Sequence, residues 1–159
     1  MKDSVFDQLV NEAVETIKKG NKIITSGLGK NVPICEKFVG SMVSMGLPAY
    51  FLHTNSAVHG DLGLVKKDDL VIVLTKSGET TESIYLTKHL ENHEANIWLL
   101  SFNQEIYLDI FFLLRSKKVS YLFSEYYLKI LLLPVTKNLF HPLDIRYVLL
   151  LFHLNLKSF

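Results

Sequence analysis

The sequence predicts an α/β protein with a mostly parallel, doubly wound sheet. Short runs of β-branched and aliphatic residues alternate with stretches in which apolar residues recur at helical spacing. Residues 70–75 (LVIVLT) are apolar almost throughout, as expected for a strand buried on both faces. Such alternation indicates right-handed crossovers with helices on both sides of the sheet, which is a three-layer α/β/α sandwich.

The first two elements follow from the spacing of apolar residues. Residues 5–17 place an apolar side chain every three to four positions, which predicts a helix that ends at Gly20. Residues 22–26 (KIITS) are rich in β-branched side chains and predict a strand, and a turn follows over residues 27–31.

A second helix is expected after this turn. Asn31 is its expected N-cap, Pro33 lies in its first turn, and Gly46 closes it after Met45. The other expected elements are strands over 49–52, 70–75 and 96–101 and a helix over 80–91.

The last third of the chain differs in composition. No glycine follows Gly78 and no alanine follows Ala95, while leucine becomes abundant. Residues 107–114, 119–133 and 144–156 fit helix or strand by pattern, and we expect helices. Because no Pro/Gly/Ser-rich linker marks the change, we expect a single domain over 1–159, with a divergent tail over 105–159.

Charge and cysteine content limit the possible partners. The net charge of +1 gives no general electrostatic reason to expect a nucleic-acid partner. The apolar runs fall short of the roughly 18–20 residues needed to cross a bilayer, and the first residues do not resemble a signal peptide. A single cysteine fits a reducing compartment. We therefore expect a cytoplasmic protein without membrane segments.

A loop rich in hydroxyl groups follows the third expected strand and opens a helix. It contains Thr75, Ser77, Thr80 and Thr81, with Gly78 between them. A helix N-terminus presents unpaired N–H groups and a partial positive charge, and glycine lets the backbone approach an anion closely. These features predict a phosphate site. The alternative is an ordinary capping box, with Thr80 or Thr81 as N-cap.

Residues 27–31 (GLGKN) also lie between a strand and a helix. Gly29 and Lys30 resemble part of a glycine-rich phosphate loop, but the P-loop spacing and its following Ser or Thr are absent. Alone, the segment favours a tight turn with a solvated lysine. Because both loops follow strands of one parallel sheet, we expect them at the same edge, where ligands bind.

A histidine lies in a glycine-bounded segment, residues 58–63 (VHGDLG). In such a setting His59 can titrate near neutrality and transfer a proton. The alternative, which is the commoner case for a single histidine, is a surface position without a chemical role. The other histidines lack a comparable setting, and we expect them to be structural or exposed.

Three segments together resemble the sugar isomerase (SIS) domain, and within it the arabinose-5-phosphate isomerase branch. They are residues 25–30 (TSGLGK), 57–65 (AVHGDLGLV) and 74–82 (LTKSGETTE), in the order and spacing of the family. The HGDLG segment is the most specific. The resemblance covers about residues 1–104.

The resemblance implies a fold, a reaction and an assembly. The fold would be a five-stranded parallel sheet between helical layers, and the assembly a homodimer or homotetramer. The reaction would interconvert D-ribulose 5-phosphate and D-arabinose 5-phosphate through an enediol, with neither a redox cofactor nor a metal.

The resemblance also implies roles for individual residues. His59, Glu79 and Lys30 would be the catalytic groups. The implied substrate-binding residues are Gly29, Lys30, Thr75, Ser77, Gly78 and Thr80.

The chain departs from the family after about residue 104. The Ser/Thr-rich segment and alanine-rich helix of SIS domains are missing there, and a frameshift in a degenerating gene is one hypothesis for the tail. Two other functions stay open. One is a non-catalytic sugar-phosphate-binding module. The other, ranked last, is a nucleotide-binding protein, for which GxGxxG or P-loop spacing is missing.

Overall fold

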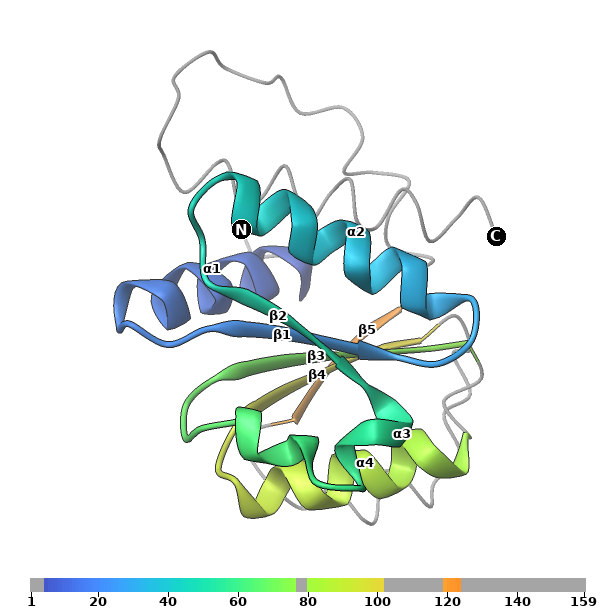
Figure 1. The fold of residues 1–159 in the computed structure, drawn as a ribbon. Coiled ribbons are helices and arrows are strands. Elements are labelled where there is room, and N and C mark those ends of the chain that lie inside the picture. The colour runs from blue at the N-terminus through green and yellow to red at the C-terminus, as the bar shows by residue number, and fades with distance from the viewer. Residues whose placement is uncertain (1–4, 77–79, 102–118, 124–159) are drawn as a thin grey trace.

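The structure is a computed structural model that describes residues 5–76, 80–101 and 119–123, of which 5, 6 and 119–123 are described by their backbone alone (Figure 1). The helices are α1 (Val5–Lys18), α2 (Asn31–Ser44), α3 (Thr54–Ala57), the 3₁₀ helix η1 (Asp61–Leu64) and α4 (Thr81–Asn92). The strands are β1 (Ile23–Gly27), β2 (Ala49–His53), β3 (Leu70–Thr75), β4 (Asn96–Ser101) and β5 (Val119–Phe123).

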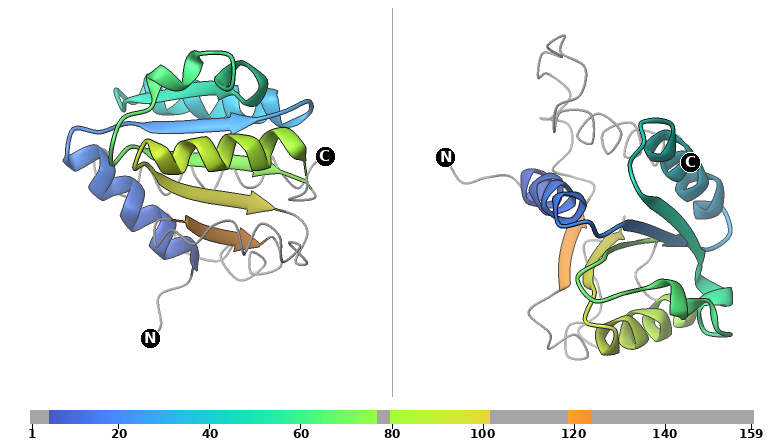
Figure 2. Two further views of the ribbon diagram at one scale, coloured as in Figure 1. Left: turned by 90° about the horizontal axis from the view of Figure 1, so that it is seen from below. Right: turned by 60° about the vertical axis from the view of Figure 1, so that its left-hand side comes forward.

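The strands form one parallel sheet in the order β2-β1-β3-β4-β5. Their arrows point the same way in Figure 2. On the inner strand β1, Ile24 is paired with Tyr50 of β2 on one side and with Val71 of β3 on the other. The predicted α/β class and parallel sheet are therefore confirmed.

Helices cover both faces of the sheet. Helices α1 and α2 lie on one face, and α3 and α4 lie on the other (Figure 1). Because side chains alternate along a strand, β3 supplies both cores. Leu70, Ile72 and Leu74 pack with α1 and α2, whereas Val71 and Val73 pack with residues of α3 and α4. This is the buried strand and the three-layer, doubly wound architecture that the sequence predicts.

The predicted helix ends at Gly20 and Gly46 are confirmed. Helix α1 buries Leu9, Val10 and Ala13, and the chain then turns at Gly20, which has a φ of +80°. Gly46 follows α2 with a φ of +73°. Side chains other than glycine are strained at these angles, so glycine ends each helix without that cost.

Residues 119–123 form a strand rather than the start of the predicted 119–133 helix. Strand β5 extends the sheet at β4, where Val119 is paired with Ile97 and Tyr121 with Leu99. The backbone partners offered by β4, together with the β-branched and aromatic residues of this segment, favour the strand. The helices predicted over 107–114 and 144–156 lie outside the described residues.

The connection between β2 and β3 is more regular than the sequence suggests. It contains α3 and η1, separated by a turn at residues 58–60. The N–H of Asn55 donates to Nδ1 of His53 at 3.3 Å and so caps the start of α3. Each of these helices is a single turn, which is too short to produce a recognisable apolar period.

Candidate functional site

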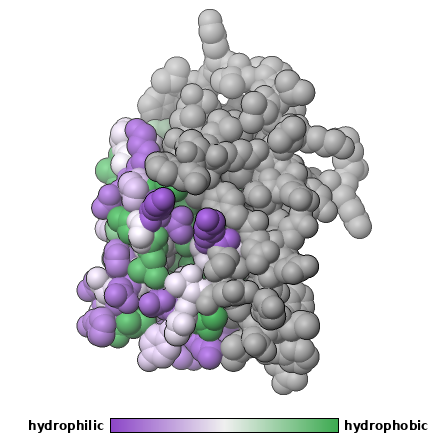
Figure 3. Space-filling model, turned by 90° about the vertical axis from the view of Figure 1, so that its right-hand side faces the viewer, coloured by the Kyte–Doolittle hydropathy of each residue, from purple (hydrophilic) through white to green (hydrophobic). Residues whose placement is uncertain are grey.

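The parallel strands end together at one edge of the sheet, which we call the carboxyl edge, at Gly27, His53, Thr75 and Ser101. The chain leaves β1 toward α2 on one face and leaves β3 toward α4 on the other face (Figure 1). In an open parallel sheet, ligands bind at such a switch point. Figure 3 faces this side of the molecule, and in its described part hydrophilic residues are interspersed with smaller hydrophobic areas.

The turn after β1 is tight and leaves its lysine exposed. The N–H groups of Asn31 and Val32 donate to the carbonyls of Leu28 and Gly29 at 3.0 and 3.1 Å. Gly29 has a φ of +55° and open space around it, and Lys30 is exposed. These are the features of the tight turn with a solvated lysine. They also leave the Lys30 ammonium accessible to a ligand at the carboxyl edge.

Asn31 is not the N-cap that the sequence predicts. Lys30 occupies that position with a helical backbone and no capping side-chain bond, and Asn31 is the first residue of α2. The Asn31 side chain instead donates from Nδ2 to the carbonyl of Leu74 on β3 at 3.2 Å. The prediction is wrong because the side chain finds a partner on another strand, which local spacing does not show.

The loop after β3 begins inside the protein and ends at a helix start. Thr75 is buried at the end of β3, and the exposed Lys76 follows it. Thr80 is the N-cap of α4, but its side chain makes no capping hydrogen bond. The third helical residue is Ser83 and not Glu or Gln, so the capping box proposed as the alternative is not formed. Ser77, Gly78 and Glu79 lie outside the described residues.

His59 lies at the exposed end of the short segment that follows β2. Its N–H donates to the carbonyl of Ser56 at 3.0 Å, and Gly60 next to it has a φ of +131°. Such an angle explains a glycine after the histidine. The exposed position fits both the proton-transfer hypothesis and the surface alternative.

A buried pair of hydroxyl groups anchors this segment to the sheet. Ser26 on β1 and Thr54 at the start of α3 are both fully buried, and their oxygens lie 3.0 Å apart. One hydroxyl donates a hydrogen bond to the other, so each of these buried groups has a partner. The pair therefore holds the start of the α3 segment against the end of β1. The pair was not predicted from the sequence, although the adjacent hydroxyl residues Thr25 and Ser26 in a buried strand were a usable sign.

The cysteine beneath the β1 turn is not a nucleophile. Cys35 on α2 is fully buried, and burial raises the pKa of its thiol to about 12. A thiol must lose its proton to react, so Cys35 stays inert near neutral pH. It serves as a core residue next to the carboxyl edge.

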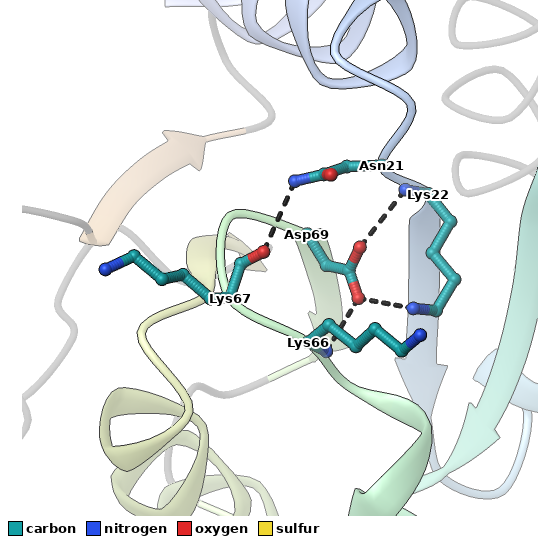
Figure 4. A network of polar contacts seen from close by, with 5 residues as sticks. All are labelled: Asn21, Lys22, Lys66, Lys67 and Asp69. Carbon is teal, nitrogen blue, oxygen red and sulfur yellow. Dashed lines mark hydrogen bonds and ion pairs between the residues drawn. The ribbon is translucent and has the colours of Figure 1, made fainter.

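The opposite edge of the sheet, which we call the amino edge, contains a compact polar network (Figure 4). Asp69 is 1% exposed and precedes β3. Its carboxylate accepts from the Lys22 N–H at 3.1 Å, the Lys66 N–H at 2.7 Å and the Lys22 ammonium at 2.5 Å. Asn21 donates to the carbonyl of Lys67 at 3.3 Å. Asp69 is thus fully engaged within the chain.

Two kinds of feature are absent from the described part of the chain. No three His, Cys, Asp or Glu side chains gather there in a way that could hold a metal ion. No helix there has both the length and the apolar character needed to cross a membrane.

A family model for the SIS domain matches residues 16–105, which is more than half of the chain. The chain belongs to the SIS domain family. The matched region contains both loops of the switch point and His59, and it ends close to the point where the sequence departs from the family. The resemblance drawn from the three motifs is confirmed.

Relatives in sequence and structure agree with this family. The arabinose 5-phosphate isomerase KdsD of Yersinia pestis is 35% identical over 105 residues, which cover 63% of this chain and 32% of that protein. A Bacteroides fragilis structure named as a phosphosugar isomerase involved in capsule formation has a TM-score of 0.67 at 26% identity, covering 99% of this chain and 81% of that one.

A second structural relative was solved with a ligand. This Escherichia coli CFT073 protein, in complex with arabinose 5-phosphate, has a TM-score of 0.56 at 25% identity, covering 97% of this chain and 85% of that one. The curated relatives are longer proteins, and the match with this chain spans less than a third of their length.

Proposed function

We propose that this chain is a sugar-phosphate aldose–ketose isomerase that interconverts D-ribulose 5-phosphate and D-arabinose 5-phosphate. The main support is the placement of two loops, residues 27–31 and 75–80, on the two sides of the β1/β3 switch point of a SIS domain. The likeness to KdsD supports the choice of substrate.

The phosphate of the sugar would bind at the start of α4. Thr75 ends a buried strand, and the Thr80 hydroxyl is not used for capping. With Ser77 and Gly78 between them, these residues would surround an anion with hydroxyl and amide donors at a helix N-terminus, where the helix dipole favours negative charge. In this proposal Gly29 lies beside the substrate and allows close approach of the backbone.

Proton transfer would fall to His59, Glu79 and Lys30. A base removes a proton from one of the carbons C1 and C2, and the enediol that forms takes a proton at the other carbon. Hydrogen moves as a proton, so the reaction needs no redox cofactor. The ammonium of Lys30, exposed at the start of α2, would stabilise negative charge that develops on the sugar oxygens.

The reaction can be followed through the C2 hydrogen. Arabinose 5-phosphate incubated with the protein in D₂O should gain deuterium at C2 as ribulose 5-phosphate appears. His59→Ala should reduce turnover more than binding if His59 transfers the proton. Binding without deuterium exchange or turnover would contradict the isomerase proposal.

The alternative is a SIS module that binds a sugar phosphate without converting it. It is favoured by the tail after residue 104, where the Ser/Thr-rich segment of the family is missing. A panel of sugar phosphates in a thermal-shift assay would identify the ligand, because a ligand that binds only the folded state raises its stability. Deuterium exchange then separates the two functions.

The proposal includes an assembly and a location. The family takes catalytic groups from neighbouring subunits, so we propose a homodimer or homotetramer in the cytoplasm. Light scattering of the purified protein would measure the assembly, and a monomer that turns over substrate would contradict it.

A further inference from the structure

The Asn31 side chain joins the first loop of the switch point to β3, the strand that leads into the second loop. The pairing of strands β1 and β3 ends at Ser26 and Val73. One residue further along β3, the carbonyl of Leu74 accepts the hydrogen bond from Nδ2 of Asn31. The bond thus links the start of α2 to the end of β3 at the point where the two strands separate.

Gly27 provides the space that this bond requires. A Cβ atom at Gly27 would lie 2.8 Å from Cβ of Asn31 and 3.2 Å from Sγ of Cys35. The first distance is shorter than real Cβ contacts, so any side chain at residue 27 would displace Asn31 from β3. Gly27 is therefore needed for the close approach of α2 to the sheet.

We propose that Asn31 is a positioning residue of the sugar-phosphate site, an inference that rests on the proposed function. Asn31 directly follows Lys30 in the chain, and its partner Leu74 directly precedes Thr75. The hydrogen bond therefore sets the position of Lys30 relative to the loop that holds the phosphate. Displacing a catalytic group by about 1 Å can cost about a hundredfold in rate.

The first test replaces Asn31 with residues of the same shape that lack the donor. Asn31→Leu adds no charge, and Asn31→Asp places an oxygen opposite the Leu74 carbonyl. Both variants should lower kcat/KM for arabinose 5-phosphate about ten- to a hundredfold. The fall should lie mainly in kcat, while the Kd for inorganic phosphate, measured on Asn31→Leu, changes little because that anion needs only the 75–80 loop.

A matched control removes another bond of the same helix. The hydroxyl of Thr25 on β1 donates to the carbonyl of Cys35 on α2 at 3.4 Å, so Thr25→Val weakens the α2 packing and leaves the link to β3 intact. This variant should lower the melting temperature and keep wild-type kcat. Gly27→Ala should reproduce the kinetic loss of the Asn31 variants, because it pushes Asn31 away from β3.

Wild-type kcat/KM in folded Asn31→Leu and Asn31→Asp, or an equal kinetic loss in Thr25→Val, would overturn the inference. A wild-type protein that neither binds nor converts sugar phosphates would instead contradict the proposed function. In that case hydrogen exchange still tests the link. Asn31→Leu should speed exchange at residues 28–32 and 74–76 together, whereas unchanged exchange at 74–76 would show that Asn31 does not hold the two loops.

Discussion

The two edges of the sheet use polar groups in opposite ways. At the amino edge, Asp69 is buried and engaged by the Lys22 ammonium and by the N–H groups of Lys22 and Lys66 (Figure 4). At the carboxyl edge, Lys30 is exposed and the hydroxyl of Thr80 does not cap its helix. The amino edge thus buries a charged group among its partners, whereas the carboxyl edge, beside its buried Ser26–Thr54 pair, presents Lys30 outward.

This difference separates stability from binding. A buried carboxylate with several donors is costly to disturb, because any group left unpaired keeps its desolvation cost. Exposed donors cost little to leave with water and can be offered to a ligand. Substitutions at the amino edge should therefore change the free energy of unfolding, and those at the carboxyl edge should change ligand binding.

The largest effect is expected at Asp69. Asp69→Asn removes the buried charge that pairs with the partly buried Lys22 ammonium, and the free energy of unfolding should fall by about 3–5 kcal/mol. Urea denaturation measures this change. The sugar-phosphate affinity of the folded variant should match that of the wild type. A loss of affinity without a loss of stability would show that the amino edge serves binding and not stability.

Ser77 tests the carboxyl edge. Ser77→Ala should weaken sugar-phosphate binding by about 1–3 kcal/mol, because a hydrogen bond to a charged group is lost. Titration calorimetry measures the dissociation constant, and urea denaturation should show nearly unchanged stability. An unchanged dissociation constant would count against the phosphate site.

The buried thiol of Cys35 predicts a pH effect beneath the carboxyl edge. Its pKa is raised from 9.0 to about 12 in the folded state, so above pH 9 the unfolded state loses the proton and the folded state keeps it. Stability is therefore fully present below pH 9 and is lost as the pH rises toward 12, by at most about 1.4 kcal/mol per pH unit. The Cys35→Ala variant should lose less unfolding free energy than the wild type between pH 9 and pH 12. Identical pH profiles would show that the thiol is not buried.

The smallest effect is expected for the exposed ion pair of the amino edge. Lys67 and Glu94 lie 2.7 Å apart, with side chains 64% and 60% exposed. Lys67→Met should leave the free energy of unfolding almost unchanged, because exposed pairs are screened by solvent. Lys67→Met is the control for Asp69→Asn. A similar loss of unfolding free energy in both variants would show that burial does not determine how much an ion pair at this edge stabilises the fold.

Much of the fold was predictable because it depends on local pattern. The apolar run of β3, the glycines after α1 and α2, and the alternation of strands and helices are visible in short windows of sequence. The positions of Lys30, Thr75 and Thr80 at the junctions that follow β1 and β3 were also predictable, because glycine and hydroxyl residues are common where a strand turns into a helix, and their roles in binding remain proposals. The errors fell on the Asn31 cap, whose side chain bonds to another strand, and on single-turn helices and β5, where short windows are ambiguous.

The sequence by itself determined the elements, their parallel alternation and the three motifs that place the chain in the SIS family. Only the tertiary structure decided how the loops are joined. Asn31 and Leu74 are 43 residues apart in the chain, Ser26 and Thr54 are 28 apart, and Lys22 and Asp69 are 47 apart. No local pattern encodes such partners, because they meet only when the order β2-β1-β3 brings distant strand ends side by side.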